Sequence, residues 1–209
     1  MNKRYAAIWF PYLLTDQMAF KQKELLGQAY VLIAQERNKQ MIVNVSREAS
    51  RQGLRPNMPL ADARITLPSL QTFKFHPQKE QKLLKAMAEW FICFTPHVAI
   101  NPPDGLFLDI TGCTVWKSEE QHVEEIAKHF AGKYHVKIGI ADTLGAAWAI
   151  AHYTKGQIAK PNEQLQYLLN LPPKALRLEE NTLQRLAKLG FHHIDSFIHI
   201  APSTLRRRF

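Results

Sequence analysis

Two carboxylates lie close together on a predicted strand-turn-strand segment, residues 104–111 (DGLFLDIT). Asp104 stands in the turn ahead of Gly105, and Asp109 ends the second strand. Two-metal phosphoryl transfer needs at least three carboxylate positions, since two divalent ions ~3.5–4 Å apart must be held and neutralised. Asp104 alone could hold at most one hydrated magnesium ion. The pattern at Asp104 is more typical of a turn-forming aspartate than of a catalytic metal site. We expect Asp109 to end its strand or to act as a cap.

Other residue types with metal-binding potential are sparse. His122, Glu125 and His129 are spaced three and four residues apart along one predicted helix, which can suit zinc. They lack cysteine neighbours, so the segment predicts a solvated helix face and no metal. The two cysteines, Cys93 and Cys113, are too few for a disulfide framework and are expected to be small buried thiols.

The chain carries a formal net charge of +9, and the excess is uneven. Residues 37–85 hold ten basic against three acidic residues, and residues 171–209 hold seven against three. Clustered positive charge attracts polyanions, whereas the alternative is a surface that only aids solubility. The residues expected to contact the phosphates of such a polyanion, which the resemblance described below implies to be DNA, are Arg47, Arg51, Arg55, Arg64, Lys188, Arg206 and Arg207.

The chain has 209 residues, and its hydrophobic periodicity predicts an α/β (α+β) fold. A β-α-β-β-α-β order, formed by the first strand and residues 78–141, is typical of a ferredoxin-like domain with an insertion at 27–75. Strands are predicted at 4–10, 30–34, 41–45, 98–100, 106–110 and 136–141, and helices from the first strand to 26 and at 47–52, 60–65, 78–94, 118–130 and 144–152. Residues 154–162 are expected to be a linker, followed by three or four short helices. The chain contains no apolar run long enough to span a bilayer, and we expect a cytoplasmic protein.

Several motifs resemble those of the Y-family (UmuC-like, translesion) DNA polymerases. In that family an adjacent Asp-Glu pair, here Asp104-Gly105, binds two magnesium ions together with an Asp on the first strand. The first strand, residues 5–11 (YAAIWFP), has no carboxylate and carries Trp9 at the matching position. The resemblance therefore implies a vestigial metal position at Asp104 and lost positions at Trp9 and Gly105.

Two further segments agree with this resemblance. Residues 41–59 (MIVNVSREASRQGLRPNMP) resemble the nucleotide-contacting fingers segment, but Arg47 and Ser50 replace its triphosphate-binding Tyr and Arg. Residues 139–149 (GIADTLGAAWA) resemble a strand-helix motif whose two lysines become Leu144 and Trp148. Taken together, the motifs resemble a catalytically degenerate branch of the family found in a bacterial mutagenesis cassette.

The resemblance implies a ferredoxin-like polymerase palm at 1–26 and 76–160, an inserted fingers-like unit at 27–75, and a helical thumb at 161–209. Residues 186–197 resemble half of a helix-hairpin-helix, although the preceding hairpin, residues 178–180, is acidic and suits phosphate poorly. The family continues beyond Phe209 with a little-finger domain and a clamp-binding tail.

The function implied is a catalytically inactive, DNA-binding adaptor in translesion synthesis, DNA repair and induced mutagenesis, with no cofactor. Its implied partners are an error-prone replicative-type polymerase, a RecA-like cassette protein and the sliding clamp, with a nucleoid-associated location. Two alternatives remain open: a low-activity DNA-directed nucleotidyltransferase using magnesium through Asp104, aided by unmatched acids such as Asp16 or Asp142, and a protein scaffold without DNA contact. The indole of Trp9 is expected to fill the cleft, and the other aromatic residues are expected to pack in cores more than to stack on bases.

Overall fold

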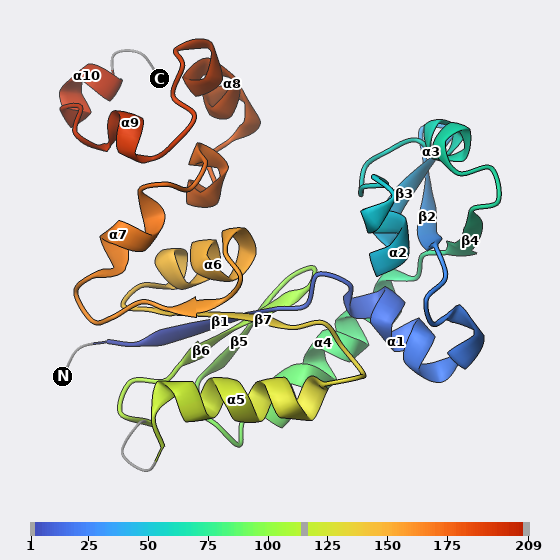
Figure 1. The fold of residues 1–209 in the computed structure, drawn as a ribbon, viewed down its shortest axis with the longest axis horizontal. Helices are drawn as coiled ribbons and strands as arrows, with labels where there is room; N and C mark the ends of the chain where they lie inside the picture. Colours follow the sequence, from blue (N-terminus) through green and yellow to red (C-terminus); the bar gives the residue numbers. More distant parts are fainter. Residues whose placement is uncertain (1–2, 114–116, 207–209) are drawn as a thin grey trace.

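The computed structural model describes residues 3–113 and 117–206, and its centre is a five-stranded sheet (Figure 1). The strand order is β5-β6-β1-β7-β8, with β8 parallel to β7 and the other neighbouring pairs antiparallel. The strands are β1 (Tyr5–Trp9), β5 (Val98–Asn101), β6 (Gly105–Asp109), β7 (Lys137–Ala141) and β8 (Gln157–Ile158). Strands β1, β5, β6 and β7 form the predicted ferredoxin-like arrangement. The expected linker at 154–162 was wrong in part, because β8 lies within it.

Helices cover both faces of this sheet. Helices α4 (Pro77–Phe91) and α5 (Glu119–Phe130) lie on one face and α6 (Leu144–Tyr153) on the other (Figure 1). Alternation along β1 directs Ile8 into the core beneath α4 and α5, whereas Ala7 and Trp9 belong to the cluster beneath α6. Side-chain direction on β1 therefore decides which helix layer each residue meets.

Two local features fix helices α5 and α6. Ser118 and Gln121 form the predicted capping box at the start of α5. Gly139 on β7 allows α6 to approach very closely, because a Cβ there would lie 2.2 Å from the carbonyl oxygen of Ala147. Helix α6 can therefore pack its alanine-rich face directly on the sheet.

A smaller sheet, of order β3-β2-β4, is inserted between α1 and α4. Its hairpin of β2 and β3 was predicted, whereas β4, which pairs parallel with β2, was not. The predicted first helix divides, because a 3-10 turn follows α1. The bounds are α1 (Leu13–Lys21), the 3-10 turn (Lys23–Leu25), β2 (Tyr30–Glu36), β3 (Lys39–Val45), α2 (Arg47–Arg51), α3 (Leu60–Thr66) and β4 (Gln71–Lys74).

The C-terminal segment is made of short helices that pack against α6. Leu186, Ile194 and Phe197 are buried in one cluster with Ala149 of α6. Gly190, with φ of +79°, follows α8 where only glycine adopts that conformation readily. The elements are α7 (Gln164–Leu168), a 3-10 turn (Pro173–Leu176), α8 (Glu180–Lys188), α9 (Asp195–Ile198) and α10 (Pro202–Arg206).

A buried arginine joins the ends of four elements. Arg4, 6% exposed, precedes β1 and donates through Nε and Nη2 to Glu119 of α5 at 2.6 and 2.5 Å. Its Nη1 donates to Asp142 at 2.7 Å, and its Nη2 also donates to the carbonyl of Ala159 at 2.7 Å. Asp142, considered above as a substitute metal ligand, is engaged in this network. The guanidinium therefore has a hydrogen-bond acceptor at each of its three nitrogens, Nε, Nη1 and Nη2.

The structure corrects two further predictions. Cys93 is exposed, not buried, because α4 ends at Phe91 rather than continuing to 94, and Cys113 is half-buried. His122 is buried and not solvated, since it packs edge-on against Phe94.

Asp109 ends its strand as expected, and its carboxylate accepts a hydrogen bond from Thr111 N at 2.9 Å. In the described residues no helix has both the length and the apolar character required to cross a membrane.

Candidate functional site

The three positions matched to metal ligands meet at one end of the central sheet. Trp9 and Gly105 are direct partners in the β1–β6 register, and Asp104 immediately precedes β6. The backbone N–H of Phe10 donates to the Asp104 carbonyl at 2.9 Å, which holds the turn against β1. The structure therefore brings Asp104 beside both residues that sequence analysis identified as replaced ligands.

The Asp104 carboxylate is bound by the indole of Trp9. Trp9 Nε1 donates to Asp104 Oδ2 at 2.9 Å. Burial raises the pKa of Asp104, and the hydrogen bond from Trp9 opposes that rise. Asp104 lies in the turn as expected, at its last residue before β6, and its side chain also binds the Trp9 indole.

The Trp9 ring belongs to a column of stacked side chains between β1 and α6. Trp9 stacks on His152 with ring centroids 4.2 Å apart and planes 18° apart, and Trp148 stacks on His152 at 4.1 Å. Lys137 Nζ lies 5.3 Å from the Trp9 ring, and the Arg177 guanidinium lies 5.1 Å from the Trp148 ring. Both distances are within the range of a cation–π interaction. The column therefore runs from the sheet to the C-terminal segment.

His152 is held neutral at the centre of this column. Its Nδ1 lies 2.9 Å from the carbonyl oxygen of Trp148, which makes Nδ1 the protonated nitrogen. Burial, together with the positive charges of Arg177 and Lys137, lowers the pKa of His152 to about 4, although the hydrogen bond to Trp148 opposes this change. A neutral imidazole avoids placing a third cation between Lys137 and Arg177.

Gly105 leaves little room for a carboxylate. A Cβ at this position would lie 3.1 Å from the carbonyl oxygen of Ile8 and 3.2 Å from Asn101 Nδ2. Both contacts are tight, and one of them is to backbone. A side chain longer than hydrogen therefore requires a local shift of β1 or of the β5–β6 turn.

Sequence reasoning missed Glu80, an acidic residue of α4 near the turn. Burial raises its pKa, and the negative charge of Asp104 raises it further. Since Glu80 lies in the helix rather than in a strand motif, only the fold could relate it to Asp104. Within residues 3–113 and 117–206, no three histidine, cysteine or acidic side chains come together as a metal site.

Asp16, the other substitute ligand considered above, takes part in a polar link between the inserted unit and the central sheet. His135 N donates to Asp16 Oδ2 at 2.7 Å, and His135 Nδ1 lies 3.0 Å from the same oxygen. Arg47 Nη1 of α2 donates to His135 Nε2 at 2.7 Å. Burial raises the pKa of Asp16, and the hydrogen bonds from His135 oppose that rise. Asp16 is therefore engaged with His135.

The basic residues expected to contact DNA do not form one cluster. Arg51 pairs with Glu48 at 2.9 Å on α2, whereas Arg55 and Arg64 are exposed on the loop before α3 and on α3. Lys188 is exposed at the end of α8. Arg206 ends α10, and Arg207 lies outside the described residues. Two basic residues that sequence analysis did not select, Lys137 and Arg177, contact the aromatic column instead.

Residues 10–152 match the model of the impB/mucB/samB family. The chain belongs to this family. It is also 37% identical over 161 residues to Protein ImuB of Caulobacter vibrioides, in two strains. This match covers 75% of the chain but 35% of the relative, so the chain spans about a third of that protein.

Solved structures similar to this impB/mucB/samB chain are Y-family DNA polymerases. An insertion ternary complex of Dbh DNA polymerase has a TM-score of 0.83 at 17% identity, covering 98% of this chain and 63% of that one. DinB from Sulfolobus solfataricus has a TM-score of 0.79 at 17% identity, covering 98% and 62%. These matches confirm the predicted fold of a polymerase palm with inserted fingers and a small helical thumb.

Proposed function

We propose that this chain is a catalytically inactive, DNA-binding adaptor in translesion synthesis, DNA repair and induced mutagenesis. The observation that carries the proposal is Trp9, whose indole occupies a matched ligand position, stacks on His152 and hydrogen-bonds Asp104. Two-metal catalysis requires carboxylates that are free to bind ions in water. Here the retained carboxylate is half-buried and hydrogen-bonded to an indole, while the two other matched positions are Trp9 and Gly105.

The proposal divides the chain into three units: a palm at 1–26 and 76–160, a fingers-like insertion at 27–75, and a thumb at 161–209. The fingers carry Arg47, Arg51, Arg55 and Arg64, which would bind backbone phosphates without reading bases. The family relationship adds candidate partners: an error-prone replicative-type polymerase, a RecA-like protein and a sliding clamp. Support for these partners is the 37% identity to ImuB over this segment.

DNA affinity is expected to fall steeply with salt. Neutralising phosphates releases counterions, and each contact contributes about −0.9 to the slope of log affinity against log salt concentration. Charge reversal at Arg51 and Arg55 (Arg51→Glu/Arg55→Glu) should weaken binding and flatten the slope by about 2. Fluorescence anisotropy with a labelled primer-template, measured at several salt concentrations, gives both values.

The matched control reverses two exposed lysines outside the basic regions, Lys155→Glu/Lys160→Glu, and changes the net charge equally. Equal weakening by both double variants would mean that only net charge matters. A salt-independent affinity, or no loss in Arg51→Glu/Arg55→Glu, would instead support the protein scaffold without DNA contact.

A second candidate function, a low-activity nucleotidyltransferase, is favoured by one observation, the charge interaction between Asp104 and Glu80 that helps to raise the pKa of Glu80. Two carboxylates could hold one magnesium ion weakly. Primer extension with all four nucleotides, in magnesium and then in manganese, distinguishes the candidates. The adaptor proposal predicts no extended product on DNA that the same sample binds. Incorporation that disappears in both Asp104→Ala and Glu80→Gln would overturn it.

A further inference from the structure

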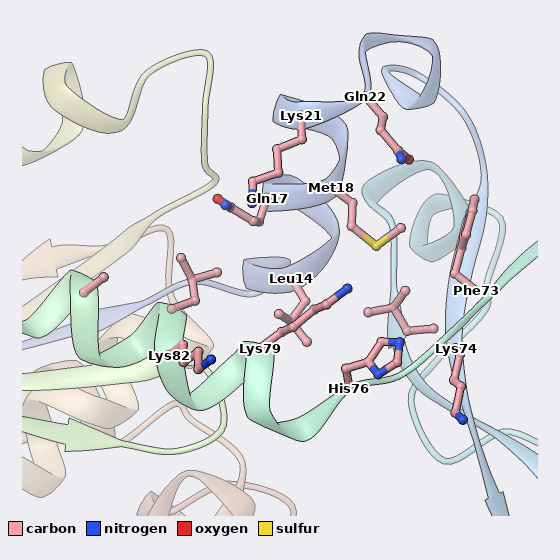
Figure 2. Close-up of a pocket in the computed structure, with 13 residues that line it drawn as sticks. Leu14, Gln17, Met18, Lys21, Gln22, Phe73, Lys74, His76, Lys79 and Lys82 are labelled. Atoms are coloured by element: carbon pink, nitrogen blue, oxygen red, sulfur yellow. The ribbon is translucent and has the colours of Figure 1, made fainter.

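A cavity of about 620 Å³ opens between α1, α4, β2 and β4 (Figure 2). Its floor is apolar and comes from separate elements, with Leu14 and Met18 from α1, Phe73 from β4 and Leu83 from α4. The volume is within the range of sites that bury a ligand or an anchoring side chain. The cavity can therefore bury an apolar group of a ligand away from water.

Positive charge surrounds this floor on several sides. Lys21 of α1, Lys74 of β4, and Lys79 and Lys82 of α4 all line the cavity, and Figure 2 shows them on the elements around it. Of the 13 lining residues none is acidic, and within the described chain none of the four lysines forms an ion pair. The cavity thus combines an apolar floor with a cationic rim.

We propose that this cavity binds an acidic amphipathic peptide segment of a partner protein. Apolar side chains of the segment would enter the floor, and its carboxylates would pair with the lysines at the rim. A nucleic-acid strand fits less well, because strand binding uses aromatic platforms for successive bases, and this floor is largely aliphatic with one aromatic residue, Phe73. Charge and apolar area together therefore favour a peptide.

Among the described residues, none of the arginines proposed to bind DNA lines the cavity, so a peptide bound there is compatible with the proposed DNA contact. Helix α4 covers the face of the central sheet opposite α6 (Figure 1). Trp9 packs in the cluster on the α6 face. Lys74, Lys79 and Lys82 also belong to the basic region that sequence analysis assigned to DNA as a whole. The folded chain directs these three to the cavity, while Arg47 extends from α2 to His135.

The test uses the whole 209-residue chain and a fluorescein-labelled synthetic peptide with leucines at helical spacing and glutamates elsewhere. Anisotropy should report saturable binding, and Lys79→Glu/Lys82→Glu should weaken it about tenfold, the loss expected from two exposed ion pairs. Lys85→Glu is the matched control, since Lys85 is exposed on the same helix but does not line the cavity. Its peptide affinity should change by less than about twofold.

Three results would overturn the proposal. An equal loss in Lys85→Glu would show a general charge effect, and equal affinity for polyglutamate of the same length would show that the apolar floor has no part. Competition by single-stranded DNA that is lost in Lys79→Glu/Lys82→Glu would assign the surface to nucleic acid. None of these readouts depends on primer extension or on Arg51 and Arg55, so the cavity and the proposed function can fail separately.

Discussion

Replacing Arg4 by alanine is expected to lower the free energy of unfolding by about 3–5 kcal/mol. The side chains of Glu119 and Asp142 are 14% and 16% exposed, and both lose their ion-pair partner in this variant. A buried carboxylate without a partner costs more than the pair contributes, because its desolvation is no longer compensated. Urea unfolding, followed by circular dichroism, measures the change.

A surface ion pair provides the control for Arg4. Lys128 and Glu124 are 2.7 Å apart on α5, with side chains 73% and 64% exposed. Exposed pairs contribute little, so Lys128→Ala should change the free energy of unfolding by less than about 1 kcal/mol. Similar losses in Arg4→Ala and Lys128→Ala would contradict a special role for the buried network.

Replacing Trp9 by aspartate is expected to destabilise the fold by about 3 kcal/mol or more. The substitution removes the ring that stacks on His152 and places a second carboxylate beside Asp104. Two neighbouring carboxylates that are partly shielded from water repel each other, and this repulsion destabilises the folded state. Thermal unfolding at neutral pH measures the effect, and an unchanged melting temperature would contradict the packed role of Trp9.

Trp9→Phe separates the hydrogen bond from the stacking. Phenylalanine keeps an aromatic ring but donates nothing, so the Asp104 carboxylate loses its N–H partner and its pKa rises further. A carboxyl group with a raised folded-state pKa contributes stability at acid pH and loses it as pH rises through that pKa. The stability gap between wild type and Trp9→Phe should therefore widen from about pH 4 towards neutrality. A gap of constant size would exclude Asp104 as its source.

Local patterns predicted most of the elements of this chain, because their signals lie within one segment. The capping box at Ser118 and the apolar spacing of α4 each specify a helix without reference to the rest of the molecule. Strands β4 and β8 were missed because they are short and pair in parallel with distant strands. Parallel pairing leaves little trace in local alternation.

The candidate site could be predicted only in part. The replacements at Trp9 and Gly105 are visible as residue types, and the alternation of β1 is enough to suggest that Trp9 packs. The column with His152 and Trp148 joins residues more than a hundred positions apart, so no periodicity reveals it. The sequence locates the excess positive charge only by residue range, and it is the fold that directs three of the lysines of residues 37–85 to the cavity and Arg47 to His135.

Gly105 makes a return to a carboxylate cluster difficult by single mutations. An acidic side chain there must first displace the carbonyl of Ile8 or the side chain of Asn101. An aspartate at position 9 would meanwhile leave His152 with only one of its two ring partners, Trp148. Under the proposed function, each single step towards an ancestral metal site lowers stability before any ion can be bound. Selection for stability alone would then disfavour variants that regain these carboxylates, so the loss of the metal site would tend to persist.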